Sequence, residues 1–344
     1  SRQLVQAGLT PESDRLADVL DGGEMDRLSG VELARAVWEH SVFSSINFDQ
    51  GATLVRALRQ TGATVAVIGD TVMDIPALLQ ANLTLVRHTS DPATLSVADI
   101  VMADDSPTII SRLLGRGRRI VNGLVDLLKL YLTQIFYTIG LIVFIQIFAT
   151  GFPFTSAEAG MIALFTLTIP AIGLSIWGDK DKPPTRNLAR VLTVFVIPSA
   201  LTISAVGLIV YLNYYELNDI TYAQTVLTHA LVLMGLILIL FIHSPLRFQG
   251  LARPARGEIR PTILAAISAA LFFILTKIPL AQELLKIFPL EEFADYLFVV
   301  QASLIWVVVF FIALHATLWV ANLFPSKPDR TPGERIERMA REQE

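Results

Sequence analysis

Six long apolar runs after about residue 120 constrain this chain more than any other feature of its sequence. They cover residues 124–149, 157–177, 191–213, 225–243, 262–280 and 298–323. Each run is close to the roughly 20 residues that an α-helix needs to cross the hydrocarbon core of a bilayer. Hydrophobic residues make up 53% of the chain and charged residues 17%, which does not fit an ordinary soluble protein. The sequence therefore predicts six transmembrane helices embedded in membrane lipid.

The polar segments between these runs alternate in their content of lysine and arginine. Basic residues are frequent in four of them, residues 112–129, 180–190, 247–260 and 327–341. A single basic residue, Lys286, falls in the alternate loops, which are residues 151–158, 213–224 and 281–296. Cytoplasmic loops of membrane proteins are enriched in lysine and arginine. The pattern predicts a multi-pass membrane protein with both termini in the cytoplasm.

The segment before the apolar runs has the pattern of an α/β fold. Short apolar stretches of strand length occur at residues 64–68, 83–86 and 98–102, and helical stretches occur at residues 54–60 and 76–80. Helices between short buried strands are typical of a doubly wound parallel sheet. The predicted fold class is thus an α/β head followed by an all-α membrane bundle.

Three parts of the chain are expected from this division. They are an α/β head with a stalk at residues 1–119, a membrane part at residues 120–324 and a cytoplasmic tail at residues 325–344. The net charge of −4 provides no broad basic field, so binding to nucleic acid is not expected. The chain has no cysteine, which excludes disulfides and thiolate chemistry.

Two aspartates follow the first predicted strand of the head. Asp70 comes directly after Gly69, at the edge of the sheet where open α/β folds bind ligands. Asp74 lies four residues further on, where the loop turns into a helix. Two carboxylates on one such loop suit Mg²⁺, which prefers oxygen ligands. The spacing equally allows a structural role, with Asp70 as a turn residue and Asp74 as a helix cap before Pro76.

Four motifs resemble those of P-type ATPases, which belong to the haloacid dehalogenase superfamily. Gly69–Leu78 resembles the hinge motif GDGxNDxPAL, and Val42–Gly51 resembles VFARxTPEQK. Ala98–Asp105 resembles the AdivLxdd strand, and Gly115–Asn122 resembles the GRxixxNi stalk before the fifth membrane helix. Six spans after that stalk equal the family's helices five to ten. Finer similarity around Phe165–Ala171 points to the bacterial branch associated with calcium uptake.

The resemblance implies the C-terminal portion of a bacterial cation pump of the plasma (inner) membrane. Its HAD-like (Rossmannoid) phosphorylation domain would be partial, and its function would be to couple ATP hydrolysis, through an aspartyl-phosphate, to cation transport. ATP and Mg²⁺ are the implied cofactors; the transported cation and the missing N-terminal part of the pump are the implied partners. The family's nucleophile belongs to a DKTGT motif, which does not occur in this sequence. The chain alone is therefore expected to be inactive.

Carried over residue by residue, the resemblance makes Asp70 the Mg²⁺ ligand and Asp74 its support. Gly51 stands where the family has a lysine that stabilises the transferring phosphoryl group, and such electrostatic donors are commonly worth roughly 10²–10³ in rate. Thr71 and Met73 stand where the family has glycine and asparagine. These departures keep an alternative open, a non-catalytic pseudo-pump or membrane subunit that binds a partner. A membrane-tethered phosphatase ranks last, because its DxDx(T/V) motif is also absent from the sequence.

Polar residues in the first two apolar runs are the candidates for an ion pathway. In the related pumps the ion sites lie between membrane helices four, five and six. Carbonyls freed by Pro170, the hydroxyls of Thr166 and Thr168 and the amide oxygen of Gln134 could ligate a hard cation. The simpler alternative, which we favour, is that these hydroxyls bind carbonyls of their own helix or contact a neighbouring helix.

Overall fold

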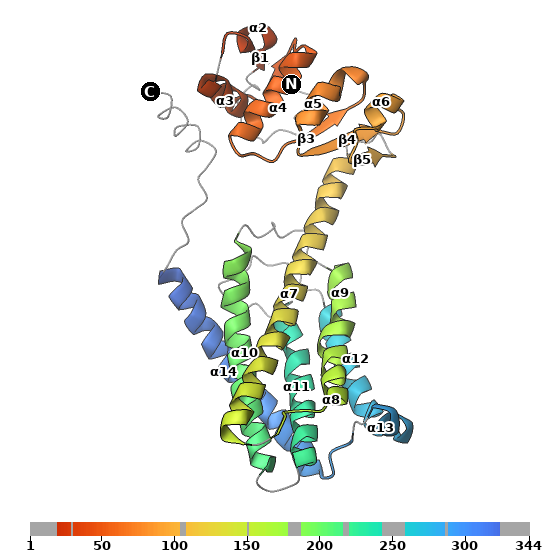
Figure 1. Cartoon of the computed structure of the whole chain (residues 1–344), viewed down its shortest axis with the longest axis vertical. Coiled ribbons are helices and arrows are strands. Elements are labelled where there is room, and N and C mark those ends of the chain that lie inside the picture. The colour runs from red at the N-terminus through yellow and green to blue at the C-terminus, as the bar shows by residue number, and fades with distance from the viewer. Residues whose placement is uncertain are drawn as a thin grey trace. The chain divides into compact units, whose positions relative to one another are not determined.

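The computed structural model describes residues 19–28, 30–103, 108–149, 151–177, 187–215, 220–242, 259–285 and 288–323. The chain divides into two compact units, Ser1–Leu113 with Ser326–Glu344, and Leu114–Pro325. Each unit is described by itself below (Figure 1). The division falls inside one long helix, six residues before the boundary expected at residue 119. The expected tail, residues 325–344, lies outside the described residues.

The described part of the first unit, called the head here, contains two small parallel sheets. Strand β1 (Val19–Asp21) pairs with β2 (Val42–Ser44), and β4 (Leu83–Arg87) lies between β3 (Ala66–Gly69) and β5 (Ile100–Met102). The helices of the head are α2 (Gly22–Met25), α3 (Gly30–Glu39), α4 (Phe48–Gln60), η1 (Val72–Asp74), α5 (Ile75–Gln80) and α6 (Pro92–Leu95). The predicted strands and helices are confirmed, whereas the HAD fold stays a prediction.

Helix α4 shows how the local sequence sets an element of the head. Asn47 and Gln50 form a reciprocal capping box, with hydrogen bonds of 2.8 and 2.9 Å between side chain and backbone. The Gln50 amide also donates to the Gly22 carbonyl at 3.0 Å, which joins α4 to α2. The buried face of α4 contributes Ala57 to an apolar cluster that includes Leu20 of β1. The cap and this apolar face together hold α4 against the β1–β2 sheet.

Asp99 fixes β5 to β4 just before β5 begins. Its Oδ2 atom accepts hydrogen bonds from the Thr84 backbone nitrogen at 2.8 Å and from the Thr84 hydroxyl at 2.9 Å. The backbone hydrogen bond, followed by the hydroxyl, holds the pKa of Asp99 below its ordinary value. The ionised carboxylate is therefore the form that stabilises the folded head.

Asp99→Asn tests this link through its dependence on pH. Because the folded-state pKa is lowered, the stabilisation is complete above the ordinary aspartate pKa of about 3.9 and disappears as the pH falls through the folded value. We expect faster hydrogen exchange in residues 83–102 of the variant at neutral pH, and rates near wild type in acid. Asp91→Asn is the control, because this exposed carboxylate, although at the N-cap position of α6, makes no capping hydrogen bond. An equal effect of both substitutions at neutral pH would contradict the prediction.

The second unit is a bundle of helices (Figure 1). Its elements, the first of which begins before the unit boundary, are α7 (Thr108–Phe148), α8 (Ser156–Ala163), the π-helix η2 (Leu164–Thr168), α9 (Ile169–Trp177), α10 (Leu188–Tyr215), α11 (Ile220–Ile242), α12 (Arg260–Leu275), α13 (Pro279–Leu285) and α14 (Phe293–Leu323). Among the described residues, five helical segments are long and apolar enough to cross a membrane. The chain is thus a multi-pass membrane protein.

The prediction of membrane-spanning helices is confirmed for five of the six apolar runs. The exception is the run that comes fifth along the chain. The run at residues 262–280 forms α12, which has 16 residues and ends at Leu275. A turn follows, and Pro279 begins the short helix α13. Proline disfavours the helical conformation of the residue before it, which explains why the apolar run does not continue as one helix. Hydrophobicity alone did not reveal this break, and the count of six stays a prediction.

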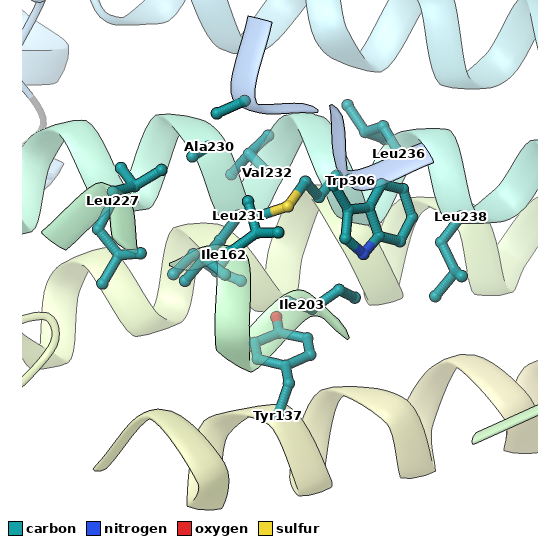
Figure 2. Packing of buried hydrophobic residues seen from close by; sticks show 14 of the residues in the cluster. Tyr137, Ile162, Ile203, Leu227, Ala230, Leu231, Val232, Leu236, Leu238 and Trp306 are labelled. Carbon is teal, nitrogen blue, oxygen red and sulfur yellow. The ribbon is translucent and has the colours of Figure 1, made fainter. Parts of the chain in front are cut away.

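Helix α11 occupies the centre of the bundle. It packs against α8, α10, α12 and α14, and 72% of an apolar 18-residue stretch within it is buried. Figure 2 shows buried side chains that converge here, among them Tyr137 of α7, Ile162 of α8, Ile203 of α10, Leu231 of α11 and Trp306 of α14. The Trp306 ring is fully buried, and its Nε1 atom donates a hydrogen bond to the Thr202 hydroxyl at 3.1 Å. This core fixes the helices that flank η2.

A glycine sets the closest approach between α11 and η2. A methyl group built on Gly235 would lie 2.6 Å from Cγ2 and 2.8 Å from Cβ of Thr166. Thr166 is β-branched and its hydroxyl is bound to the Ile162 carbonyl, so it has little freedom to turn away. Small residues at helix contacts in membranes allow such close packing.

Gly235→Ala is expected to destabilise the bundle by about 1–3 kcal/mol, the usual cost of overpacking. The measurement is thermal unfolding of the full chain in detergent micelles. Gly160→Ala is the matched control, because nothing lies within 4 Å of the added methyl group and alanine favours the helix. A Gly235→Ala midpoint equal to that of Gly160→Ala would show that the contact is not tight.

Candidate functional site

The loop after β3 is built around the Asp74 carboxylate. The Oδ2 atom of Asp74 accepts hydrogen bonds from the backbone nitrogens of Asp70 and Thr71, both at 3.0 Å, and from the Thr71 hydroxyl at 3.1 Å. A methyl group on Gly69 would lie 2.8 Å from the buried Leu78 side chain, so the strand passes close to α5. Asp74 therefore closes the turn that precedes it, whereas its side chain forms no capping hydrogen bond to the helix that contains Pro76.

Asp70 lies on the same loop, and its carboxylate is paired with a positively charged side chain, that of Arg87. Its Oδ1 atom accepts hydrogen bonds from Arg87 Nε at 2.9 Å and from the Ser90 hydroxyl at 2.8 Å. The Nη2 atom of Arg87 forms an ion pair with Oδ2, so the guanidinium contacts both carboxylate oxygens. The side chains of Arg87 and Asp70 are 39% and 41% exposed. The pair is therefore accessible to solvent.

The register of the sheet explains why Asp70 and Arg87 lie next to each other. Gly69 at the end of β3 pairs with Val86 of β4, so the next residues, Asp70 and Arg87, leave neighbouring parallel strands at the same edge. The prediction that Asp70 lies at the carboxyl edge of the sheet is confirmed. Its partner there was not expected, because Arg87 belongs to none of the motifs that carried the resemblance.

With Arg87 in place, the Asp70 carboxylate does not fit a divalent cation. Mg²⁺ requires near-octahedral oxygen coordination, whereas both Asp70 oxygens are bound to side-chain donors and one Asp74 oxygen to the loop. In the part of the chain that the structure describes, no group of three or more His, Cys, Asp or Glu could hold a metal ion. The assignment of Mg²⁺ to Asp70 and Asp74 remains a prediction.

The three positions that depart from the family motifs lie around this loop. A methyl group on Gly51, in the first turns of α4, would lie 3.8 Å from Cβ of Ala77 in α5. Thr71 and Met73 are exposed on the loop itself, Met73 to 53%. The structure thus brings Gly51 next to α5, which follows the Asp70 loop.

The candidate ion pathway lies in the bundle, where α8 passes through η2 into α9. The Thr166 hydroxyl is buried and donates to the Ile162 carbonyl at 2.7 Å. The Thr168 hydroxyl donates to the Ala163 carbonyl at 3.2 Å, across the wider π-turn. Pro170 is buried at the start of α9. Both hydroxyls therefore bind carbonyls of their own helix, as the simpler alternative predicted.

Helix α7 contributes buried polar atoms that are not hydrogen-bonded. Within the described residues, no hydrogen-bond partner is found for the Thr133 hydroxyl, the Gln134 Oε1 atom or the Tyr137 hydroxyl. The Tyr137 hydroxyl faces Thr166 but without normal hydrogen-bond geometry. Gln134 also lines a largely apolar cavity of about 340 Å³ between α7 and residues Ala163 and Leu167. Sequence reasoning counted Thr133 and Tyr137 among the polar residues of the first apolar run but named only Gln134 of this run as a possible ligand.

Glu158 is a buried acid. Sequence reasoning placed it at the end of the loop at residues 151–158 and did not predict its burial. It lies in the first turn of α8 and is 5% exposed. Its Oε2 atom accepts hydrogen bonds from the Thr155 nitrogen at 2.7 Å and from the Thr155 hydroxyl at 2.9 Å. Thr225 and Thr228 of α11 lie beside the same carboxylate. The Thr-x-x-Glu spacing, which is typical of a capping box, was the available signal.

Thr155→Ala tests the contribution of this cap. Loss of the hydroxyl removes an N-cap acceptor and is expected to cost about 1 kcal/mol of stability. The measurement is thermal unfolding of the full chain in detergent. Thr155→Ser keeps the hydroxyl and should stay near wild type, and equal loss in both variants would argue against the cap.

Comparison with known proteins places the chain beside cation pumps. It is 29% identical over 268 residues to "Calcium-transporting ATPase CtpE" of Mycolicibacterium smegmatis, which covers 75% of this chain and 33% of that protein. "Calcium-transporting ATPase" of Bacillus subtilis is 26% identical over 67% of this chain and 27% of that protein. "Probable cation-transporting ATPase exp7" of Streptococcus pneumoniae is 27% identical over 52% of this chain and 24% of that protein. No protein-family model matches the chain.

These similarities support the family resemblance of the motifs. Relatives named calcium-transporting or cation-transporting ATPases match up to three quarters of the chain. The chain spans a third or less of the length of these relatives. It therefore fits a part of such an ATPase.

Proposed function

We propose that this chain, which fits a part of a P-type ATPase, works in a pump that couples ATP hydrolysis to cation transport through an aspartyl-phosphate. The similarity to calcium-transporting ATPases over up to 75% of the chain carries the proposal and makes Ca²⁺ the first candidate ion. The apolar helices provide the membrane part that transport requires. ATP and Mg²⁺ are cofactors of the proposed whole pump, with most of the nucleotide site outside this chain.

The head would contribute the loop of Gly69, Asp70 and Asp74 to the phosphate and Mg²⁺ site. Bound Mg²⁺ would neutralise charge that develops on the transferring phosphoryl group. Asp74 holds the turn through three hydrogen bonds, which leaves Asp70 at the edge of the sheet. The proposal requires Arg87 to release the Asp70 carboxylate.

The ion pathway is proposed between α7 and the α8–α9 segment. Three features support it: the amide oxygen of Gln134 has no hydrogen-bond partner, η2 departs from regular helix geometry, and Pro170 donates no backbone hydrogen bond. Thr166 and Thr168 would have to exchange their carbonyl partners for the ion. Ca²⁺ takes 6–8 oxygen ligands, so these groups would supply part of its shell.

A direct test is the ATPase activity of the full-length parent protein against a panel of cations. We expect stimulation by Ca²⁺ and a loss of about 10²-fold or more in Asp70→Asn, because a charge at the phosphoryl site is removed. Activity unchanged by Asp70→Asn would overturn the Mg²⁺ role of this residue. Activity that no cation stimulates would favour the alternative function described next.

A non-catalytic pseudo-pump or membrane subunit that binds a partner remains the second candidate. Two observations favour it: Gly51 replaces the family lysine, and Arg87 neutralises Asp70. Such a protein would keep the fold and the membrane helices without phosphoryl transfer. Its expected signature is a folded parent protein with no phosphoenzyme formed from ATP.

Both termini are proposed to lie in the cytoplasm, from the distribution of lysine and arginine. The chain has no cysteine, so single introduced cysteines report their own accessibility. In intact cells a membrane-impermeant maleimide should label Phe152→Cys in the loop between α7 and α8, and should not label Asp91→Cys in the head. Permeabilised cells should show both labelled. Labelling of Asp91→Cys in intact cells would reverse the orientation.

A further inference from the structure

We propose that Glu158 is a proton-binding site of the membrane bundle. Its carboxylate takes a proton from water and becomes a neutral acid, which donates this proton from Oε1 to the hydroxyl oxygen of Thr228 in α11. The inference concerns the bundle alone and does not depend on the pump proposed above. It assigns to Glu158 a ligand, the proton, that the cap of α8 does not require.

Glu158 lies where a negative charge is costly. Its side chain is 5% exposed, in the first turn of the apolar helical segment Ser156–Leu174. Within the described residues, no charged side chain is among the groups that interact with its carboxyl group. A buried carboxylate without a counter-charge favours its neutral form or the binding of a cation. The position therefore calls for a positively charged ligand.

The oxygens around the carboxyl group fit a proton and not a metal ion. The Oε2 atom already accepts two hydrogen bonds from Thr155, and the hydroxyls of Thr225 and Thr228 lie beside the carboxyl group. The Thr225 hydroxyl donates to the Thr221 carbonyl at 3.0 Å. Ca²⁺ needs about 6–8 oxygen ligands, which this small set does not supply, whereas a proton needs one acceptor.

Thr228 provides the second, independent observation. Its side chain is 1% exposed, and within the described residues no hydrogen-bond partner is found for its hydroxyl oxygen. A buried hydroxyl without a partner is unfavourable. A protonated Oε1 atom supplies the missing donor, so that one proton neutralises the acid and also satisfies the hydroxyl. The resulting hydrogen bond joins α8 to α11, two helices that pack against each other.

The titratable groups on the elements that pack against α8 have other partners or other surroundings. In the described residues they are Tyr222 and His229 of α11 and Glu283 of α13. The hydroxyl of Tyr222 donates to the carboxylate of Asp295, and Nδ1 of His229 donates to the Thr225 carbonyl at 2.8 Å. Glu283 is exposed. None of them is among the groups that interact with the buried carboxyl group.

Infrared difference spectroscopy of the full chain in detergent at neutral pH tests the inference. The C=O stretching band of a protonated carboxyl group is separate from the bands of a carboxylate, and it shifts in D₂O. We expect this band in wild type and its loss in Glu158→Gln. Glutamine keeps the cap, because Thr-x-x-Gln also forms a capping box, and its amide nitrogen is able to donate to Thr228.

Two further variants locate the proton. Thr228→Val keeps nearly the same shape but removes the acceptor, so the band of Glu158 should move to higher frequency. Glu283→Gln is the matched control, since it removes an exposed carboxyl group from the neighbouring helix α13 and should leave the band unchanged.

Three results would overturn the inference. A wild-type spectrum that does not differ from Glu158→Gln in this band would show an ionised carboxylate held by the cap alone. An unmoved band in Thr228→Val would remove Thr228 as the acceptor of the proton. Loss of the band in Glu283→Gln would show that it does not belong to Glu158. If Glu158→Gln misfolds, comparison of wild type with Thr228→Val still decides, because identical spectra of the two contradict the proposed hydrogen bond.

Discussion

Every backbone amide inside a bilayer must find its hydrogen-bond partner within the protein, and this requirement governs the larger unit of the chain. It explains why the apolar sequence folds into long helices such as α10 and α14. It also makes the exception at η2 informative, because a π-turn and Pro170 interrupt the regular pattern there. The hydroxyls of Thr166 and Thr168 bind carbonyls in this segment. Irregular backbone between packed helices is where an ion can find oxygen ligands, which gives the proposed pathway its location.

In the head, the loop after β3 is organised by two aspartate side chains. Two carboxylates lie on one loop, and each is bound by a different part of the chain. Asp74 accepts backbone hydrogen bonds and shapes the turn, whereas Asp70 pairs with Arg87 of the adjacent strand. The two carboxylates, four residues apart in the sequence, therefore have different partners and different roles in the fold.

The proposed function and its alternative differ in what the chain would do with these features. A pump would require the carboxylate of Asp70 and the polar atoms near η2 to change partners during its cycle. A non-catalytic relative would keep both sets of contacts as permanent structure. The matches to calcium-transporting ATPases favour the pump. Gly51, Thr71 and Met73, which depart from the family motifs, and the pairing of Arg87 with Asp70 favour the alternative.

The sequence by itself determined the apolar helices, the strands of the head and the position of Asp70 at a sheet edge, because these follow from hydrophobic runs and from local spacing. Only the tertiary structure decided which groups meet. The Arg87 partner of Asp70 depends on strand register, and the contact of Gly235 with Thr166 depends on helix packing. The burial of Glu158 depends on α11 lying beside α8. Such contacts join residues far apart in the chain, and no local pattern records them.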